Sequence, residues 1–331
     1  MKAVVVEDYG LDHARLADVP PPPVGPQDIR IKVCSAGVSF ANLLAIEGKH
    51  QNRADPPFTP GTEVAGIVLE RGARTSLFKP GDRVVAGVRR GGFSEEVAAP
   101  ECNVFALPAD VSFDAAVHFP TIYATAYAAL KWRARLAPGE TLLVHGAAGG
   151  SGLAAIELGK VMGATVIASA GSPEKLRVAA EHGADICIDY SANGFRDIVL
   201  AKTDGRGADV IFDPVGGKAF EESLRCIAPE GRIIPMGFAS GIIPSVPANI
   251  ALVKNITVVG LYWGYYMGWG RQAPPAGMPA RVRKAFQEML EWTSSGLLNP
   301  RTQSAYPLAD FRQALQALSS RSVIGRSVLN P

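Results

Sequence analysis

Cysteine is scarce in this sequence, and its copies are scattered. Four cysteines stand among 331 residues, at positions 34, 102, 187 and 226, and no two of them form a CxxC pair. Cys34, Cys187 and Cys226 lie in or beside apolar runs. We therefore expect buried free thiols rather than disulfides or a structural zinc site.

An excess of charge of one sign is also lacking, as is any long apolar run. The formal net charge of +2 gives no electrostatic basis for a nucleic-acid or membrane partner. The first eight residues contain acids where a signal peptide needs an apolar core. The stretch 256–270 is interrupted by glycines and is too short to span a bilayer, which takes about 20 apolar residues. These absences predict a cytoplasmic protein.

The first 122 residues show the pattern of strands separated by Pro/Gly turns. Residues 29–33 alternate between apolar and polar, as a half-buried strand does, and 63–69 and 83–86 are further strand candidates. Prolines 20–23 cannot lie inside a paired strand, so we expect a stiff connector there.

From residue 123 to 266, after a helical pattern that begins at Thr121 and continues to Ala134, short apolar runs alternate with amphipathic helices. This order predicts an α/β fold with a doubly wound parallel sheet of the Rossmann type. The expected strands are Thr141–His145, Thr165–Ser169, Ile186–Ile188, Asp209–Asp213, Arg232–Met236 and Ile256–Leu261. The expected helices are Leu153–Met162, Pro173–His182, Phe195–Thr203, Ala219–Ile227 and Ala248–Val253.

Residues 267–331 do not continue the alternation. Two helices, Ala280–Ser294 and Ala309–Leu318, and a strand, Ser322–Leu329, are expected there. We assign them to the first, β-rich domain, so the nucleotide-binding domain is an insertion and a cleft forms between the two.

A glycine-rich turn links the first strand of this alternation to its first helix. The run LLVHGAAGGSGLAAI at 142–156 places Gly149, Gly150, Ser151, Gly152 and Leu153 between an apolar strand and a helix start. Residues without side chains let the backbone approach a pyrophosphate, and the helix start offers unpaired N–H groups. In this βαβ context the pattern predicts dinucleotide binding.

The second strand of the alternation bears on the choice of dinucleotide. An NAD-specific fold ends that strand with an acid that binds the ribose 2′-hydroxyl. Here residues 168–173 are ASAGSP, with no acid, and Lys175 and Arg177 follow. We expect Lys175 to favour the 2′-phosphate of NADPH and Arg177 to be a solvated helix residue.

Several motifs together resemble the medium-chain dehydrogenases/reductases, over nearly the whole chain. They include GTEVAG at 61–66, PGDRV at 80–84, TAY at 125–127 and FDPVGG at 212–217. GFASG at 237–241 and NITVVG at 255–260 are similar to the zinc-independent NADPH:quinone oxidoreductase branch. The resemblance implies a Rossmann domain inserted in a β-rich, GroES-like catalytic domain, and a reductase that transfers hydride from NADPH to quinones or similar small electrophilic carbonyl compounds.

Metal is not expected. Zinc-dependent relatives hold a catalytic zinc with a Cys, a His and a Cys or acid, and the corresponding positions here are Ser39, Thr62 and Thr121. Neutral hydroxyls are poor zinc ligands.

The resemblance also implies which residues bind the cofactor. They are Thr125, Gly149, Gly150, Ser151, Gly152, Leu153, Gly171, Lys175, Tyr190, Gly237, Phe238, Ala239, Tyr262, Trp263 and Arg326. Some quinone reductases carry Asn at the position of Ser39 and Tyr at that of Leu44, so substrate contacts there do not transfer.

A quinone accepts hydride readily, and the hydroquinone anion can take its proton from water, which suits a sequence with no evident acid/base pair. Ser39, Asn42 and Thr62 are the candidates for hydrogen bonds to the developing oxyanion, and we expect at least one of them to be structural. Structural roles are expected for His50, His118 and His145, although His50 lies in a first-domain loop that could touch substrate.

Two other functions stay open at this point. An enoyl reductase of α,β-unsaturated ketones or thioesters would use the same cofactor but must protonate a carbon. Tyr123 is the one candidate acid for that step, although we expect it to pack against the sheet. An NADPH-binding protein with a structural or regulatory task is the alternative from another class. The substrate itself would be selected by loops 43–58 and 262–278.

The sixth expected strand predicts a homodimer. A Rossmann strand order puts residues 255–261, which are apolar and β-branched, at the edge of the sheet, where an open strand invites pairing. The resemblance implies pairing with the same strand of a second subunit about a two-fold axis. The alternative is that residues 262–278 fold back over this edge within a monomer.

Overall fold

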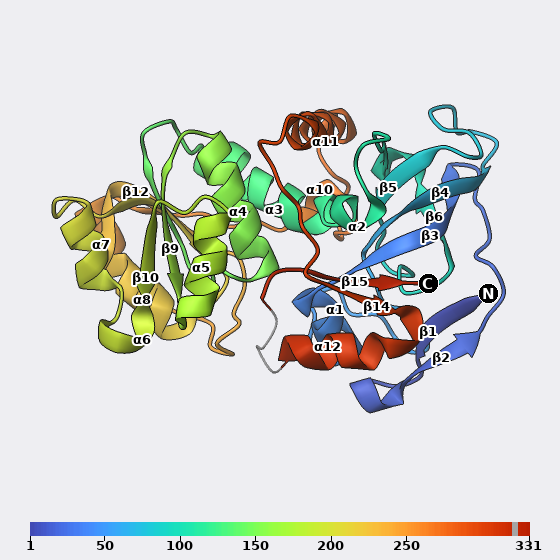
Figure 1. The fold of residues 1–331 in the computed structure, drawn as a ribbon, viewed down its shortest axis with the longest axis horizontal. Coiled ribbons are helices and arrows are strands. Elements are labelled where there is room, and N and C mark those ends of the chain that lie inside the picture. Colours follow the sequence, from blue (N-terminus) through green and yellow to red (C-terminus); the bar gives the residue numbers. More distant parts are fainter. Residues whose placement is uncertain (320–323) are drawn as a thin grey trace. The chain divides into compact units, whose positions relative to one another are not determined.

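The structure is a computed structural model that describes residues 1–319 and 324–331. The chain divides into two compact units (Figure 1). The first comprises Met1–Ala124, Trp263–Gly296 and Pro300–Pro331, and the second comprises Thr125–Tyr262 and Leu297–Asn299. The predicted fold class is confirmed, because one unit contains a parallel Rossmann-type sheet and the other is rich in antiparallel strands.

The second unit is built on six parallel strands in the order β10-β9-β8-β11-β12-β13. All six predicted strands are present: β8 (Thr141–Val144), β9 (Thr165–Ala170), β10 (Ile186–Asp189), β11 (Ala208–Asp213), β12 (Ile227–Pro235) and β13 (Thr257–Val258). The last strand is much shorter than predicted, because only Thr257 and Val258 pair with β12. It lies at the edge of the sheet, as a Rossmann order requires.

Helices cover both faces of this sheet. Figure 1 shows α4 and α5 on one face and α7 and α8 on the other, as expected of a doubly wound fold. The bounds agree with the five predicted helices within about three residues: α4 (Gly150–Val161), α5 (Pro173–Glu181), α7 (Arg196–Lys202), α8 (Gly217–Cys226) and α9 (Ala248–Lys254). The short helix α6 (Tyr190–Asn193) is not among the predicted ones. A core that includes Leu143, Ile167, Phe195 and Phe220 fills the space between the strands and α7 and α8.

The helical pattern predicted at 121–134 is present in a less regular form. It consists of a π-helical stretch η3 (Phe119–Tyr123), a short α3 (Ala124–Tyr127) and a second π-helical stretch η4 (Ala128–Ala134). The N–H of Tyr123 bonds to the carbonyl of His118 at 3.0 Å, five residues back. The helix is thus wound more widely than the sequence pattern suggests.

The first unit contains a sheet in the order β14-β15-β3-β4-β5-β7, with β6 also paired to β3 and a separate hairpin of β1 and β2. Prolines 20–23 lie outside the strands, as predicted. The strands are β1 (Lys2–Val6), β2 (Ala14–Asp18), β3 (Asp28–Val38), β4 (Glu63–Arg71), β5 (Arg83–Gly87), β6 (Glu96–Pro100), β7 (Val104–Ala106), β14 (Ser304–Pro307) and β15 (Ser327–Asn330).

The helices of this unit come from both ends of the chain. They are α1 (Phe40–Ile46), α2 (Phe113–Ala116), α10 (Trp263–Tyr266), α11 (Met278–Ser294) and α12 (Phe311–Ser319), with short 3-10 turns η1 (Leu11–His13), η2 (Glu101–Asn103) and η5 (Leu308–Asp310). Of the strand predicted at Ser322–Leu329, Ser322 and Val323 lie outside the described residues, and β15 begins at Ser327.

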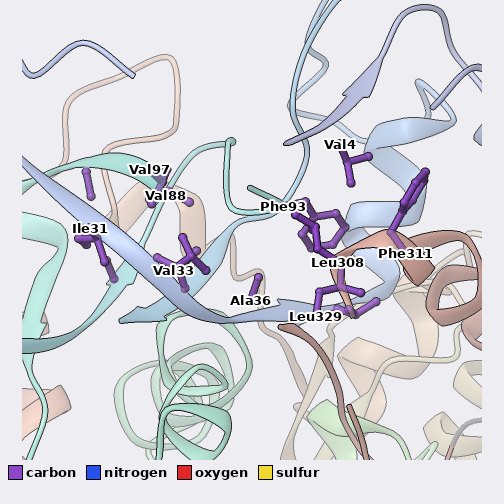
Figure 2. Close-up of a cluster of buried hydrophobic side chains, with 14 of the residues drawn as sticks. Val4, Ile31, Val33, Ala36, Val88, Phe93, Val97, Leu308, Phe311 and Leu329 are labelled. Carbon is purple, nitrogen blue, oxygen red and sulfur yellow. The ribbon is translucent and has the colours of Figure 1, made fainter. Parts of the chain in front are cut away.

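One apolar core joins the N-terminal and C-terminal parts of the first unit. Figure 2 shows Val33 and Ala36 on β3 and, near Phe93, side chains from η5, α12 and β15. Leu308, Phe311 and Leu329 are buried in the same cluster as Val4 and Phe93. Burial of such side chains typically stabilises a fold by about 1.5–3 kcal/mol each.

The burial predicted for the cysteines is partly wrong. All four are free thiols, but only Cys226 is buried, while Cys34 is half-buried and Cys187 is exposed. Cys187 lies on β10, the edge strand of its sheet, so the side chain next to the buried Ile188 faces outward. Within the described part of the chain, no helix combines the length and apolarity that crossing a bilayer requires.

Candidate functional site

Glycine shapes the turn between β8 and α4. Gly146 has a φ of 56°, and its carbonyl accepts the N–H of Gly149, the N-cap of α4, at 3.0 Å. A Cβ at Gly152 would lie 2.4 Å from the Gly146 carbonyl oxygen and 2.9 Å from the Ala147 Cα. No side chain fits at residue 152, so the backbone of the turn is not covered by a side chain at that position.

The amino end of α4 opens directly from this turn. The N–H of Leu153 bonds to the Gly149 carbonyl at 2.9 Å and is the first to bond back along the helix. The N–H groups of Gly150, Ser151 and Gly152 therefore lie in the first turn, where they have no helical acceptor. Such N–H groups, at the positive end of the helix dipole, bind phosphate oxygens. The predicted pyrophosphate contacts thus lie together.

The ends of β9 and β10 meet beside Gly171. Tyr190, the first residue of α6, is 48% exposed, and its hydroxyl oxygen lies 2.9 Å from where a Cβ of Gly171 would stand. Lys175 lies in the first turn of α5, where its N–H bonds to the Ser172 hydroxyl at 3.4 Å. The residues predicted around the adenosine ribose therefore lie at neighbouring strand ends.

Other predicted cofactor residues also follow strand ends in this unit. Gly237, Phe238 and Ala239 follow β12, and the N–H of Ala239 bonds to the Pro214 carbonyl after β11 at 3.1 Å. Tyr262 follows β13. Since β8 is flanked by β9 and β11, the strand order reverses between β8 and β11. Open parallel sheets bind their ligands at the carboxyl ends of the strands around such a reversal.

Three further predicted cofactor residues are not part of these strand-end segments. Thr125 lies in the short helix α3. Trp263 belongs to the first unit, where it is 6% exposed and its Nε1–H donates to the Pro120 carbonyl at 2.7 Å. Arg326, also in the first unit, is 2% exposed, and its guanidinium carbon lies 4.7 Å from the centre of the Tyr123 ring.

In the first unit, Ser39 and Asn42 form a helix cap. Asn42 Oδ1 accepts the N–H of Ser39 at 2.8 Å and its hydroxyl at 2.9 Å, and Ser39 is the N-cap of α1. Thr62 is half-buried immediately before β4. The structure therefore brings two of the three candidate oxyanion contacts together, but partly uses their hydrogen-bonding capacity to start a helix.

One buried acid, Glu63, is absent from the predicted site residues; it is the first residue of β4. It is fully buried; its Oε2 accepts the Thr121 hydroxyl, and the backbone N–H groups of Thr121 and Ile122 also bond to the carboxyl. Its Oε1 has no hydrogen-bond partner among the described residues. Burial raises the pKa of Glu63 to about 8, against the lowering effect of these bonds and of Arg326. At neutral pH the carboxyl is therefore mostly protonated and uncharged.

A signal for Glu63 was present in the sequence. The acid starts a strand whose next residues, 64–66, are all apolar or glycine and are buried in the structure. An acid in such a run must be paired or neutral, because an unpaired buried charge is too costly. Within the motif GTEVAG, only Thr62 is assigned a role in the expected substrate site, and the adjacent acid is assigned none.

The residues of the first unit do not fit a catalytic zinc. Across residues 1–319 and 324–331, no group of three or more His, Cys, Asp or Glu side chains is placed to hold a metal ion. At the positions that correspond to zinc ligands, the hydroxyl of Ser39 bonds to Asn42 and that of Thr121 to Glu63. Neutral hydroxyls are poor ligands for zinc.

Comparison with known proteins gives matches over both units. A family model described as alcohol dehydrogenase GroES-like domain matches residues 25–109, and one described as zinc-binding dehydrogenase matches residues 150–289. The chain is 41% identical over 311 residues to quinone oxidoreductase-like protein 2 homolog of Nematostella vectensis, covering 93% of this chain and 82% of the relative. It is 39% identical over 316 residues to quinone oxidoreductase-like protein 2 of Mus musculus, covering 95% and 88%.

A solved structure extends these matches to the fold of the whole chain. Quinone oxidoreductase of Escherichia coli, crystallised in complex with NADPH, has a TM-score of 0.92 at 27% identity, with 100% of each chain covered.

The raised pKa of Glu63 predicts how stability depends on pH. Between the usual carboxyl pKa of 4.5 and about 8, the folded state binds a proton that the unfolded state has lost. This contribution to the free energy of unfolding is complete below pH 4.5 and declines by about 1.4 kcal/mol per pH unit until pH passes 8. Glu63→Gln, which is neutral at every pH, should remove that decline in denaturant titrations at successive pH values.

The matched control is Asp110→Asn, at an exposed turn of the same unit. It should retain the wild-type decline. Parallel stability profiles for wild type and Glu63→Gln between pH 5 and 8 would contradict the assignment of a neutral Glu63.

Proposed function

Because this chain belongs to the quinone oxidoreductase family of the medium-chain dehydrogenases/reductases, we propose that it transfers hydride from NADPH to quinones or similar small electrophilic carbonyl compounds without a catalytic zinc. The observation that carries the proposal is the pairing of a bare glycine turn with a second strand that ends without an acid. The solved E. coli relative, whose crystals contain NADPH, supports the choice of cofactor.

The strand ends of the second unit fit NADPH. Gly149 to Leu153 would hold the pyrophosphate, since a Cβ at Gly152 would fill the turn. β9 ends at Ala170, so this strand itself brings no carboxylate to a 2′-phosphate, and Lys175 offers a positive charge in the first turn of α5. Tyr190, which covers Gly171, presents an exposed ring for the adenine.

NADPH, when bound, supplies the hydride, and reduction of a quinone to a hydroquinone requires one further proton, which water can provide. The chain then has to hold the quinone and stabilise the anion that develops on its oxygen. We assign hydrogen bonding to that oxygen to Asn42 and Thr62, and a structural role to Ser39, whose hydroxyl donates to Asn42 Oδ1. The neutral state of Glu63 matters here, because an ionised carboxylate in this unit would oppose negative charge on the substrate.

The proposal predicts a particular activity profile. Purified protein should oxidise NADPH faster than NADH with a panel of benzoquinones and naphthoquinones, contain less than one equivalent of zinc by elemental analysis, and retain activity after treatment with a chelator. Turnover of α,β-unsaturated ketones alone would instead favour an enoyl reductase. Cofactor binding without turnover of either class would favour a structural role, and tightly bound stoichiometric zinc would contradict zinc independence.

Lys175→Glu tests the assignment of the 2′-phosphate contact. The substitution replaces a charge-assisted bond with repulsion and should weaken NADPH binding by roughly 2–4 kcal/mol, while NADH binding changes far less. The control is Arg177→Glu, because Arg177 is exposed and paired with Glu181 on the same helix. Equal losses for NADPH and NADH would contradict the assignment; dissociation constants can be measured by titration of nicotinamide fluorescence.

We also propose a homodimer formed through the β13 edge. Both residues of β13 are exposed, which argues against the alternative that the following loop covers this edge within one chain. Exposed apolar side chains adjoin the strand in sequence: Ile242, Ile243, Val246, Leu252 and Val253. Such a concentration of exposed apolar residues typically marks an interaction surface, and a second copy offers the same unpaired edge.

The backbone of β13 allows a selective test. The N–H of Val259 bonds inward to the Ile233 carbonyl at 2.8 Å, so the N–H of Val258 points by alternation to the open edge. Val258→Pro removes only that outward donor and should yield monomer or insoluble protein in analytical ultracentrifugation, whereas Val258→Thr, which keeps it, should remain a dimer. A wild-type monomer at micromolar concentration would refute the proposal.

A further inference from the structure

A buried histidine lies directly before the glycine-rich turn and has no part in the function proposed above. His145 follows β8, is 2% exposed, and its N–H bonds to the Phe212 carbonyl on β11 at 3.0 Å. Its ring is held by two serines from different elements. Nδ1 lies 2.7 Å from the hydroxyl of Ser169 on β9, and Nε2 lies 2.7 Å from the hydroxyl of Ser223 on α8.

The direction of each hydrogen bond to the ring follows from the bond that Ser223 makes to Ala219. The Ser223 hydroxyl donates to the Ala219 carbonyl at 2.7 Å, so its proton is committed and its oxygen must accept from His145 Nε2–H. Nδ1 of the neutral ring is then an acceptor, and the hydroxyl of Ser169 donates to it. The result is a directed chain of hydrogen bonds from Ser169 through His145 and Ser223 to a helix carbonyl.

The surroundings keep the imidazole neutral. Burial lowers the pKa of His145, although the nearby carboxylates of Asp213 and Glu222 act in the opposite direction. One oxygen of Asp213 is occupied by the N–H groups of Val215 and Gly216, at 2.8 and 3.0 Å. The ring of Phe195 packs edge-on against the imidazole, with centroids 4.6 Å apart. The groups around His145 thus favour a neutral ring with two hydroxyl partners.

We propose that the chain Ser169–His145–Ser223 positions the glycine-rich turn and makes His145 a positioning residue for dinucleotide binding. The carbonyl of Ser169 also accepts the N–H of Ala147 at 3.2 Å, so β9 holds the turn on both sides of Gly146. Together these bonds tie β9, the end of β8 and α8 to the segment whose backbone must receive a pyrophosphate. The inference rests on the proposed use of NADPH.

The effect of the Ser169–His145–Ser223 hydrogen bonds can be distinguished from that of the Lys175 contact, because these bonds hold the turn that would bind the pyrophosphate. The pyrophosphate is common to NADPH and NADH, so breaking the chain should weaken both cofactors equally. Ser169→Ala and Ser223→Ala should each raise the dissociation constants of NADPH and NADH about tenfold, because a buried imidazole nitrogen loses its partner. At saturating NADPH, kcat should stay within about twofold of the wild-type value, since only binding is affected.

The matched control is Thr203→Val in the same unit. Its hydroxyl donates to the Val199 carbonyl at 2.8 Å and accepts the N–H of Gly207 at 2.9 Å, at the far end of α7 from His145. This variant also loses a hydroxyl but should bind both dinucleotides like wild type. Unchanged dissociation constants in both serine variants, with wild type binding normally, would overturn the inference alone. Wild type that binds neither dinucleotide would contradict the proposed function and the inference with it.

The tautomer provides a test that does not depend on cofactor or on the folding of any variant. In wild-type protein labelled with ¹⁵N-histidine, the chain requires His145 to carry its proton on Nε2, with a bare Nδ1, at neutral pH. The opposite tautomer, or a doubly protonated ring, would break the directed chain and overturn the proposal.

Discussion

The proposed cofactor site of the second unit depends on one close approach of the chain to itself. The backbone at Gly152 passes so near the Gly146 carbonyl that a Cβ would lie 2.4 Å from that oxygen. This contact lets α4 start at Gly150, shortly after β8 ends at Val144, and the first N–H groups of the helix have no helical acceptor. The other residues proposed to bind the cofactor in this unit lie where parallel strands end. The ends of β9 and β10 bring Gly171 and Tyr190 together, and the segment from Gly237 follows β12.

The interior of the first unit contains a different feature, a buried acid that is kept uncharged. Glu63 is buried, and its carboxyl bonds to the Thr121 hydroxyl and to backbone N–H groups, but one oxygen is left without a partner among the described residues. An ionised carboxylate would be costly there, so the proton is retained. The hydroxyls of Ser39, Thr62 and Thr121 are poor ligands for zinc.

The sequence predicted the regular parts of the fold well, because their signals are local. The run at 142–144 is apolar and lies just before a glycine-rich turn, so its identity as a buried strand does not depend on distant residues. β13 shows the limit of this reasoning. Residues 255–261 have strong strand propensity, but only two pair, since the extent of an edge strand is decided by its partners. Cys187 was misjudged for the same reason, as its exposure depends on β10 being an edge.

The sequence predicts those parts of the candidate site that depend on the spacing of residues along the chain. It does not predict the parts that depend on contacts between distant residues. The glycine turn and the absence of an acid after β9 are visible in the sequence, and both describe backbone positions. The state of Glu63 depends on Thr121, and that of His145 on Ser169 and Ser223, all far apart in the chain. In both places burial keeps an ionisable group neutral, and hydroxyls from other elements bond to it. Hydrogen bonds between neutral groups fix the positions of side chains without placing a net charge near them. Hydride transfer to the proposed quinone, which is itself neutral, depends first on how the reacting groups are positioned.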